Sequence, residues 1–355
     1  MDIARLRDER LRSHRLTAPA ASIGDAAAHM LATQAQEFWG GRWALAARTR
    51  GDPRLSDVDR AFDRGEVVRS WTMRGTIHAI PPRDLAWVLS LTGARQIRQG
   101  ASVHLREGID DETVATAERL ARGALAGGNR LTRRELFEVF DQGGVPTAGQ
   151  RGYHVLTRLS MGLVIVQGPV VPREGGPSRE QYFVLVDEWI RDPVTPADPL
   201  AEFFVRYIAA HGPAGVRDFA WWTSLPLGDA RRAAEAASDR LTEVDDGLYV
   251  APERPRRSSA APAVVALPPF EEYYLSYADR ATHCAPEFTR VIGPSMNGIV
   301  RPILIARGEI VGVWTHSVAV GRHAHDPVPE LFVPGAATDA EISDALERYR
   351  RFVTS

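Results

Sequence analysis

Residues 67–80 read VVRSWTMRGTIHAI, and this stretch decides the fold that we predict for the N-terminal part of the chain. Two runs rich in β-branched and aromatic residues, 67–72 and 76–80, flank Arg74-Gly75, which indicates a β-hairpin. Helical spacing of apolar residues precedes the hairpin and resumes after it. The predicted helices span residues 2–16, 23–33, 43–48, 57–64 and 83–91. Helices followed by a two-stranded hairpin are typical of a winged helix.

The same order of elements recurs twice farther along the chain. In the second set, Thr132 and Glu135 have the spacing of a capping box at the start of a helix. This set has predicted helices at 111–125, 132–140 and 150–160, and strands at 163–167 and 182–187. The third set has predicted helices at 200–210, 214–223 and 228–238, and strands at 241–243 and 248–250.

A linker rich in Pro, Arg and Ser at 253–262 precedes a strand-rich region. Its predicted elements are strands at 263–267, 298–306, 309–316 and 329–333 and a helix at 339–352. We therefore predict an α+β fold of three tandem winged-helix units followed by a small β-barrel domain with a terminal helix. The predicted domains are residues 1–100, 101–195, 196–255 and 263–355.

The composition is ordinary for a soluble globular protein, with 44% hydrophobic and 25% charged residues among 355. No window approaches the roughly 18 uninterrupted apolar residues that a membrane span needs. The charged N-terminal residues lack the apolar core of a secretory leader. A single cysteine, Cys284, excludes an internal disulfide. We expect a cytoplasmic protein with no membrane partner and, in the absence of a long heptad helix, a monomer.

The basic residues exclude several kinds of chemistry, because all 43 of them are arginine. Without lysine the chain cannot use a P-loop lysine or a lysine Schiff base. Arginine stays protonated in proteins, so it cannot replace the amine, although its planar fork can bind phosphate. The first hundred residues hold 16 arginines against 11 acidic residues, a balance of +5. A surface for a polyanion is therefore expected in this part of the chain.

Five short motifs follow one another in a characteristic order. The first is MLATQAQ at residues 30–36, which ends in Gln-x-Gln. The others are MRGTIH at 73–78, DLAW at 84–87, LPPFEEY at 267–273 with Asp279-Arg280, and the set Gly298, Pro302, Gly308, Gly312 and Trp314. In this order and spacing the chain resembles the AlkZ/YcaQ family of bacterial winged-helix DNA glycosylases. The Gln-x-Gln motif places it nearer the AlkZ branch, since the YcaQ branch has Gln-x-Asp.

The resemblance implies tandem winged helices and a C-terminal β-barrel that form a concave face for DNA. It implies monofunctional excision of alkylated purines from double-stranded DNA, including bulky adducts and crosslinks left by genotoxic natural products. The biological role would be base excision repair or self-resistance to such a compound. No cofactor and no metal are expected. The chain departs from the family where basic residues often follow the tryptophan, because Thr315-His316 follow Trp314 here.

Gln34 and Gln36 are the predicted catalytic residues. A purine alkylated at N7 or N3 carries positive charge and leaves as a neutral base, so the enzyme need not protonate it. It has to place a water molecule and stabilise an oxocarbenium-like sugar. A glutamine carbonyl can accept from water while its amide donates to a sugar or phosphate oxygen. We expect Gln36 to position the water and Gln34 to hold the deoxyribose or assist that water.

Both side chains can converge on one sugar only if the helix ends near Gln34 or the lesion lies between them, because residues two apart diverge on a helix. The pair Gly40-Gly41 favours an early helix end. Without the other motifs, the two glutamines would be read as solvent-facing helix residues.

Other residues are predicted to support the glutamines or to bind DNA. On the first hairpin, Arg74 is expected to bind a phosphate, and His78, near Thr76, to orient a glutamine or water; the alternative is a purely structural hairpin. The predicted phosphate contacts are Arg42, Arg48, Arg50 and Arg54. The loop at 293–298, with Ser295 and Asn297, is expected to enter the minor groove.

Three further groups have a structural and a functional interpretation. Tryptophans 39, 43 and 71 either shape a pocket for an aromatic adduct or belong to the core. The charged residues of the LPPFEEY region, Glu271, Glu272, Asp279 and Arg280, are expected to form structural ion pairs, with a catalytic carboxylate as the second choice. His316, His323, His325 and Asp326 have ligand types suited to zinc, which would favour a metal hydrolase. The main alternative function is a winged-helix transcriptional regulator without enzymatic activity.

Overall fold

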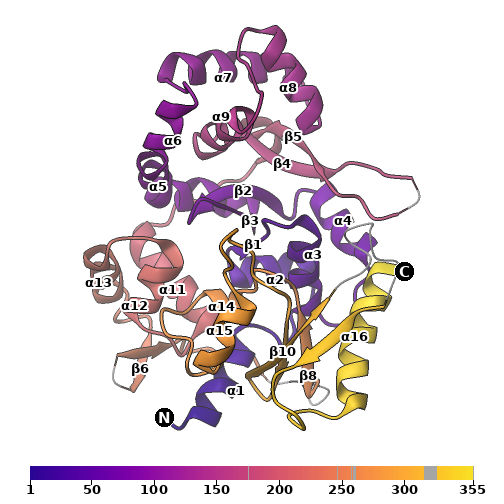
Figure 1. Cartoon of the computed structure of the whole chain (residues 1–355). Helices are drawn as coiled ribbons and strands as arrows, with labels where there is room; N and C mark the ends of the chain where they lie inside the picture. The colour runs from indigo at the N-terminus through magenta and orange to yellow at the C-terminus, as the bar shows by residue number, and fades with distance from the viewer. Residues whose placement is uncertain (175, 246, 257, 259–260, 316–325, 355) are drawn as a thin grey trace. The chain divides into compact units, whose positions relative to one another are not determined.

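A computed structural model describes residues 1–174, 176–245, 247–256, 258, 261–315 and 326–354 of the chain. Helices and antiparallel sheets alternate along these residues (Figure 1). The chain divides into two compact units. The first unit combines Met1–Val58 with Leu200–Ser355, and the second is the continuous segment Asp59–Pro199. The three winged-helix units and their boundaries stay a prediction.

The second unit contains a sheet in which its strands follow the order β3-β2-β4-β5. Its elements are β2 (Val68–Met73), β3 (Thr76–Ile80), α5 (Pro82–Gln99), α6 (Ala101–Arg106), α7 (Asp111–Leu125), α8 (Arg133–Gln142), α9 (Arg151–Met161), β4 (Ile165–Val170), β5 (Gln181–Leu185) and α10 (Val186–Trp189). Both predicted hairpins are present, and they pair with each other at Arg69 and Gln167. The two hairpins that the sequence assigns to separate domains therefore share one sheet.

Local signals in the second unit act as the sequence predicts. Helix α7 has the predicted bounds and begins after Asp110, whose side chain accepts from the Thr113 amide. At the start of α8, Thr132 and Glu135 form the predicted capping box. Helix α5 is longer than predicted because it continues to Gln99.

The first unit begins with α1 (Ile3–Ser13), α2 (Ile23–Met30), β1 (Thr33–Gln34) and α3 (Phe38–Ala47). The prediction that the second helix reaches Thr33 is wrong, because Leu31 has a φ of 60° and ends α2 at Met30.

The prediction that this second helix ends before Gly40-Gly41 is confirmed, and both glycines lie inside the next helix, α3. A Cβ on Gly41 would come within 2.4 Å of the Ala35 Cβ, and one on Gly40 within 3.3 Å of Pro269. The glycines thus allow α3 to pack closely against two other segments.

The part of the first unit after residue 199 starts with three helices and a short hairpin. These are α11 (Pro199–His211), α12 (Val216–Thr223), α13 (Leu227–Ala236), β6 (Thr242–Asp245) and β7 (Leu248–Val250). They correspond to the third predicted set of elements.

The remaining elements are β8 (Val264–Leu267), α14 (Glu272–Leu275), α15 (Pro286–Ile292), β9 (Ile303–Ala306), β10 (Glu309–Thr315), β11 (Val328–Leu331) and α16 (Asp339–Thr354). The four strands form a sheet of order β11-β10-β9-β8. As far as the chain is described, this is an open sheet with edges at β8 and β11, where a barrel was predicted. Barrels that are filled by side chains commonly use about eight strands, and four short ones are too few to close.

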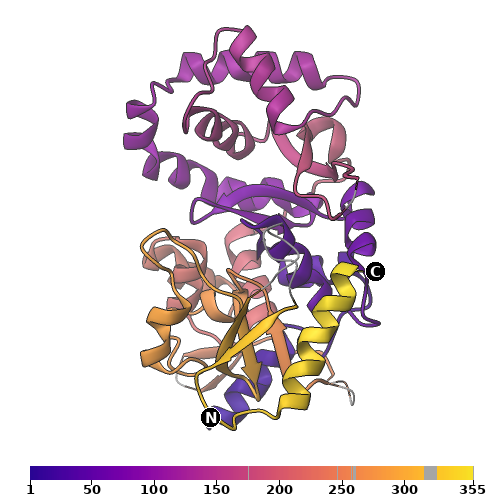
Figure 2. The same ribbon diagram turned by 45° about the vertical axis from the view of Figure 1, so that its right-hand side comes forward.

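Helix α16 covers this sheet, as Figure 2 shows. Tyr349 of α16 is fully buried and packs against Trp43 of α3 and Trp314 of β10, with ring centroids 5.3 and 4.7 Å away. The aromatic cluster therefore joins the C-terminal helix to both the sheet and α3. None of the described helices combines the length and apolar character that a membrane span requires.

A half-buried histidine links α1 to α2. His29 Nε2 lies 2.7 Å from the Ser13 carbonyl, and Nδ1 lies 3.2 Å from the Arg15 guanidinium. Since a guanidinium can only donate, Nδ1 accepts and the neutral ring donates from Nε2. Burial, with the charge of Arg15, lowers the pKa of His29 from its ordinary 6.5 to about 3.

We expect acid to destabilise the protein through His29. The unfolded chain binds a proton there near pH 6.5, whereas the folded chain does not until about pH 3, so unfolding becomes easier as pH falls below 6.5. His29→Gln keeps a donor for Ser13 and does not titrate. Between pH 7.5 and pH 5 the free energy of unfolding of this variant should therefore fall by about 2 kcal/mol less than that of the wild type, as measured by urea unfolding. Equal pH dependence in both proteins would contradict this assignment.

Candidate active site

Gln34 lies in the two-residue strand β1 and is buried, with 6% of its surface exposed. Its backbone N–H donates to Glu272 Oε1 across 2.7 Å. Gln36 is half-buried in the bend between β1 and α3. Neither glutamine is in a helix, so the interpretation as solvent-facing helix residues is wrong. The divergence of side chains two residues apart on a helix does not apply to this pair.

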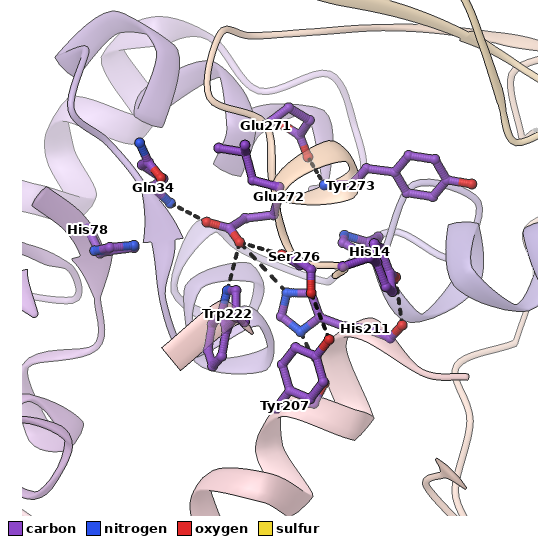
Figure 3. Close-up of polar contacts among 12 residues, drawn as sticks. His14, Gln34, His78, Tyr207, His211, Trp222, Glu271, Glu272, Tyr273 and Ser276 are labelled. Atoms are coloured by element: carbon purple, nitrogen blue, oxygen red, sulfur yellow. Dashed lines mark hydrogen bonds and ion pairs between the residues drawn. The ribbon is translucent and has the colours of Figure 1, made fainter. Parts of the chain in front are cut away.

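The Glu272 carboxylate is the centre of the polar network around Gln34 (Figure 3). Its Oε2 atom accepts from Trp222 Nε1 at 2.8 Å and from Ser276 Oγ at 2.6 Å. His211 Nε2 lies 3.9 Å from the same oxygen. Glu272 is fully buried, so its charge depends on these donors. Residues of α12, α14 and β1 therefore meet at one carboxylate.

Glu271 holds the same short helix against α3. Its carboxylate forms an ion pair with Arg48, and its side chain also accepts from the Tyr273 amide as the N-cap of α14. Arg48 in addition donates to the Ala44 carbonyl at 3.0 Å. Both partners are at most 2% exposed. The predicted structural ion pairing is thus confirmed for Glu271, whereas Arg280 lies over the Tyr274 ring, 4.4 Å from its centroid.

The prediction of phosphate contacts does not fit Arg42 and Arg48. Arg42 is 1% exposed and lies over the Phe38 ring at 4.1 Å, and Arg48 is completely buried. Arg42 lies in α3, where nearly all residues are buried, and Arg48 is the C-cap of that helix, so neither guanidinium is exposed for a phosphate contact. Arg50 and Arg54, which follow α3, are exposed. Phosphate binding stays a prediction for these two.

The second unit carries the predicted supporting residues on the β2–β3 hairpin. His78 is fully buried, with Nε2 3.1 Å from Arg74 and Nδ1 2.9 Å from Thr72 Oγ1. Since Arg74 can only donate, Nε2 accepts and Nδ1 carries the proton, toward the Thr76 carbonyl at 3.2 Å. Arg74 and Thr76 are half-buried. The roles of these residues toward the glutamines stay a prediction.

The loop at 293–298 is exposed from residue 294 onward and is held by hydrogen bonds within and next to it. The Ser295 amide donates to the Ile299 carbonyl at 2.9 Å, and the Gly298 amide donates to the Ser295 carbonyl at 2.8 Å. Asn297 and Ser295 are both exposed, and Met296 between them is completely so. The side chains are accessible for a DNA contact, which stays a prediction.

The tryptophans belong mainly to the core. Trp43 and Trp71 are each 2% exposed, and their indole N–H groups donate to the Ala266 carbonyl and to the Tyr153 hydroxyl. Trp39 is half-buried beside Trp314. Trp43 and Trp71 are too deeply buried to line a pocket for an adduct together with Trp39.

Three of the four residues predicted to bind a metal, His316, His323 and His325, lie outside the residues that the structure describes. Asp326 forms an ion pair with Arg350 at 3.3 Å. The residues that are described contain no group of three His, Cys, Asp or Glu side chains placed to hold a metal ion.

Sequence reasoning missed the partners of Glu272. Trp222 and Ser276 are separated from Gln34 by most of the chain, and no local pattern connects them. One sequence feature could have indicated distant partners for Glu272, namely the pair of adjacent carboxylates in LPPFEEY. Two neighbouring acids beside buried aromatic residues need separate donors. Here the donor to Glu271 is Arg48, the C-cap of α3, and a donor to Glu272 is the Gln34 amide of β1.

Comparison with known proteins relates the whole arrangement to one family. The family model described as DNA glycosylase AlkZ-like matches residues 27–352. A curated relative from Streptomyces sahachiroi, named interstrand DNA cross-link repair glycosylase, is 26% identical in an alignment of 318 residues that covers 84% of this chain and 82% of the relative. The solved structure of Streptomyces sahachiroi DNA glycosylase AlkZ matches with a TM-score of 0.77 and 21% identity, covering 99% of this chain and 96% of that one. This structural likeness shows a shared fold.

We expect Arg48→Met to lower the free energy of unfolding by about 3–5 kcal/mol, because it leaves the buried Glu271 carboxylate without its cation. Arg50→Ala, at an exposed site, should change it by no more than about 0.5 kcal/mol. Urea unfolding of both variants measures the difference. Equal stabilities, combined with weaker DNA binding by Arg48→Met, would instead support the phosphate contact.

Proposed function

Because the chain belongs to the family of AlkZ-like DNA glycosylases, we propose that it hydrolyses the N-glycosidic bond of cationic alkylated purines in double-stranded DNA. The preferred lesion is N7-alkylguanine, including bulky adducts and interstrand crosslinks. The placement of Gln34 is the observation that supports this most directly. A glutamine of the family's motif lies outside any helix, and its backbone amide is held by a buried carboxylate.

The chemistry requires little acid catalysis. An N7-alkylated guanine departs as a neutral base, so the barrier lies in forming a sugar cation and bringing water to it. We assign Gln36, the less buried residue, to the water, and Gln34 to the deoxyribose or to that water. Neutral amides suit a place beside DNA phosphate, where a further carboxylate would have to be desolvated. The relative named for interstrand crosslink repair supports a bulky lesion as substrate.

Binding to the duplex is assigned to exposed residues of the first unit. Arg50 and Arg54 can pair with phosphates, and Ser295 and Asn297 on the exposed loop can donate to groove or backbone atoms. The enzyme is proposed to act as a monomer. A transcriptional regulator is not favoured, because the matched family is one of glycosylases.

The proposed enzyme is monofunctional. Strand cleavage by a bifunctional glycosylase proceeds through a Schiff base on an amine, and the chain has no lysine. The remaining amine is the N-terminus, which contacts Asp245. Excision should therefore end at an intact abasic site.

We expect Gln34→Ala and Gln36→Ala each to slow the release of 7-methylguanine from duplex DNA by about 10²–10³-fold, as the loss of one positioned hydrogen-bonding group does elsewhere. Affinity for the duplex should be retained. Gln142→Ala, at an exposed glutamine in α8, is the matched control and should excise at the wild-type rate. Base release is measured under single-turnover conditions. Wild-type rates in both active-site variants would reject the assignment of the glutamines, and no release by the wild type would reject the glycosylase.

The absence of lysine gives a second expected result. The reaction product should stay uncleaved on a denaturing gel until alkali is added, and borohydride should trap no protein–DNA adduct. A bifunctional glycosylase treated in parallel provides the positive control. Abundant trapped adduct that survives acetylation of the N-terminal amine would overturn the monofunctional proposal.

A further inference from the structure

The Glu272 carboxylate contacts the backbone of Gln34 itself rather than a neighbouring residue. Oε1 accepts from the Gln34 amide at 2.7 Å, while Oε2 accepts from Trp222 and Ser276 at 2.8 and 2.6 Å. Both oxygens are thereby engaged, and the residue has no solvent exposure. Hydrogen bonds to an ionised acceptor are the shorter and stronger ones. Glu272 therefore fixes one backbone atom of the motif to α12 and α14.

We propose that Glu272 is the positioning residue for Gln34, and that it sets the direction of the Gln34 side chain during base excision. The proposal rests on the catalytic role of Gln34 given above. A strand of two residues offers little rigidity of its own, so the orientation of Gln34 depends on what holds its amide. Misplacing a reacting group by about 1 Å can cost about 10²-fold in rate.

A glutamine cannot replace Glu272, although it has the same shape. The carboxylate has two acceptor oxygens, whereas an amide has one oxygen and one NH2 group. If the amide oxygen accepts from Gln34, the NH2 group faces the indole N–H of Trp222, and two donors oppose each other. If the amide is turned, the NH2 group opposes the N–H of Gln34. Either orientation displaces one of the two segments.

A nearby carboxylate provides a control with the same kind of bonding. Asp218 accepts from the backbone amides of Gly215 and Ala278, each at 3.0 Å, and neither of these residues belongs to β1. Asp218→Asn should lower stability through lost amide bonds while leaving the excision rate unchanged. Comparing it with Glu272→Gln separates loss of stability from loss of orientation.

The test is a double-mutant cycle on single-turnover release of 7-methylguanine from duplex DNA, with the full-length chain. We expect Glu272→Gln to slow release by about 10–10²-fold, with the dissociation constant for the duplex changed less than about twofold. In the Gln34→Ala background the same substitution should add no further loss, because its effect passes through the missing side chain. Exchange of the Gln34 amide hydrogen should also become faster in Glu272→Gln.

Each contrary result has a distinct meaning. If Glu272→Gln slows Gln34→Ala as much as it slows the wild type, the residue does not act through Gln34 and the inference is overturned. If wild type and Gln34→Ala release base equally, the proposed role of Gln34 fails and this inference fails with it. Should Glu272→Gln not fold, Ser276→Ala removes one donor to Oε2 and replaces it in the cycle. That variant should slow release severalfold only where Gln34 is present, and a loss independent of Gln34 would again overturn the inference.

Discussion

Two adjacent buried carboxylates at the start of α14 are the constraint on which the first unit depends. Glu271 pairs with Arg48, 223 residues earlier in the chain, and Glu272 binds the amide of Gln34, 238 residues earlier. A buried charge without a partner is costly, so neither carboxylate tolerates the absence of α3 or β1. The requirement brings the two ends of the chain into one unit. It also explains why Arg48, which the sequence predicts to contact DNA phosphate, is found inside the protein.

The packing of α3 follows from the same constraint. To bring Arg48 to Glu271, the helix has to approach Ala35 and the Pro268-Pro269 segment closely, and Gly41 and Gly40 lie where side chains would obstruct it. Trp43 on the same helix packs against Tyr349 and donates to the Ala266 carbonyl. Helix α3 thus reaches β8, α14 and α16 with different residues. The bend that holds Gln36 directly precedes it.

Local patterns predicted much of the second unit and less of the site. The bounds of α7, the capping box of Thr132 and Glu135, and strand β3 all follow from residues close in sequence. The end of α2 at Leu31, the place of Gly40-Gly41 within α3 and the burial of Arg42 and Arg48 depend on distant segments, so no local pattern indicates them. The motif order pointed to the glycosylase family and to Gln34. What holds Gln34 became visible only with α14 and α12 in place.

The discontinuous first unit has a consequence for the order of assembly. The ribosome completes Asp59–Pro199, a contiguous unit with its own sheet, long before it makes α14. Until then the N-terminal segment has neither the carboxylate partner of Arg48 nor the acceptor for the Gln34 amide. The motif that emerges among the first residues is therefore among the last to gain its geometry. A nascent chain stalled before residue 271 carries Gln34 without the carboxylate that holds its amide in the folded protein.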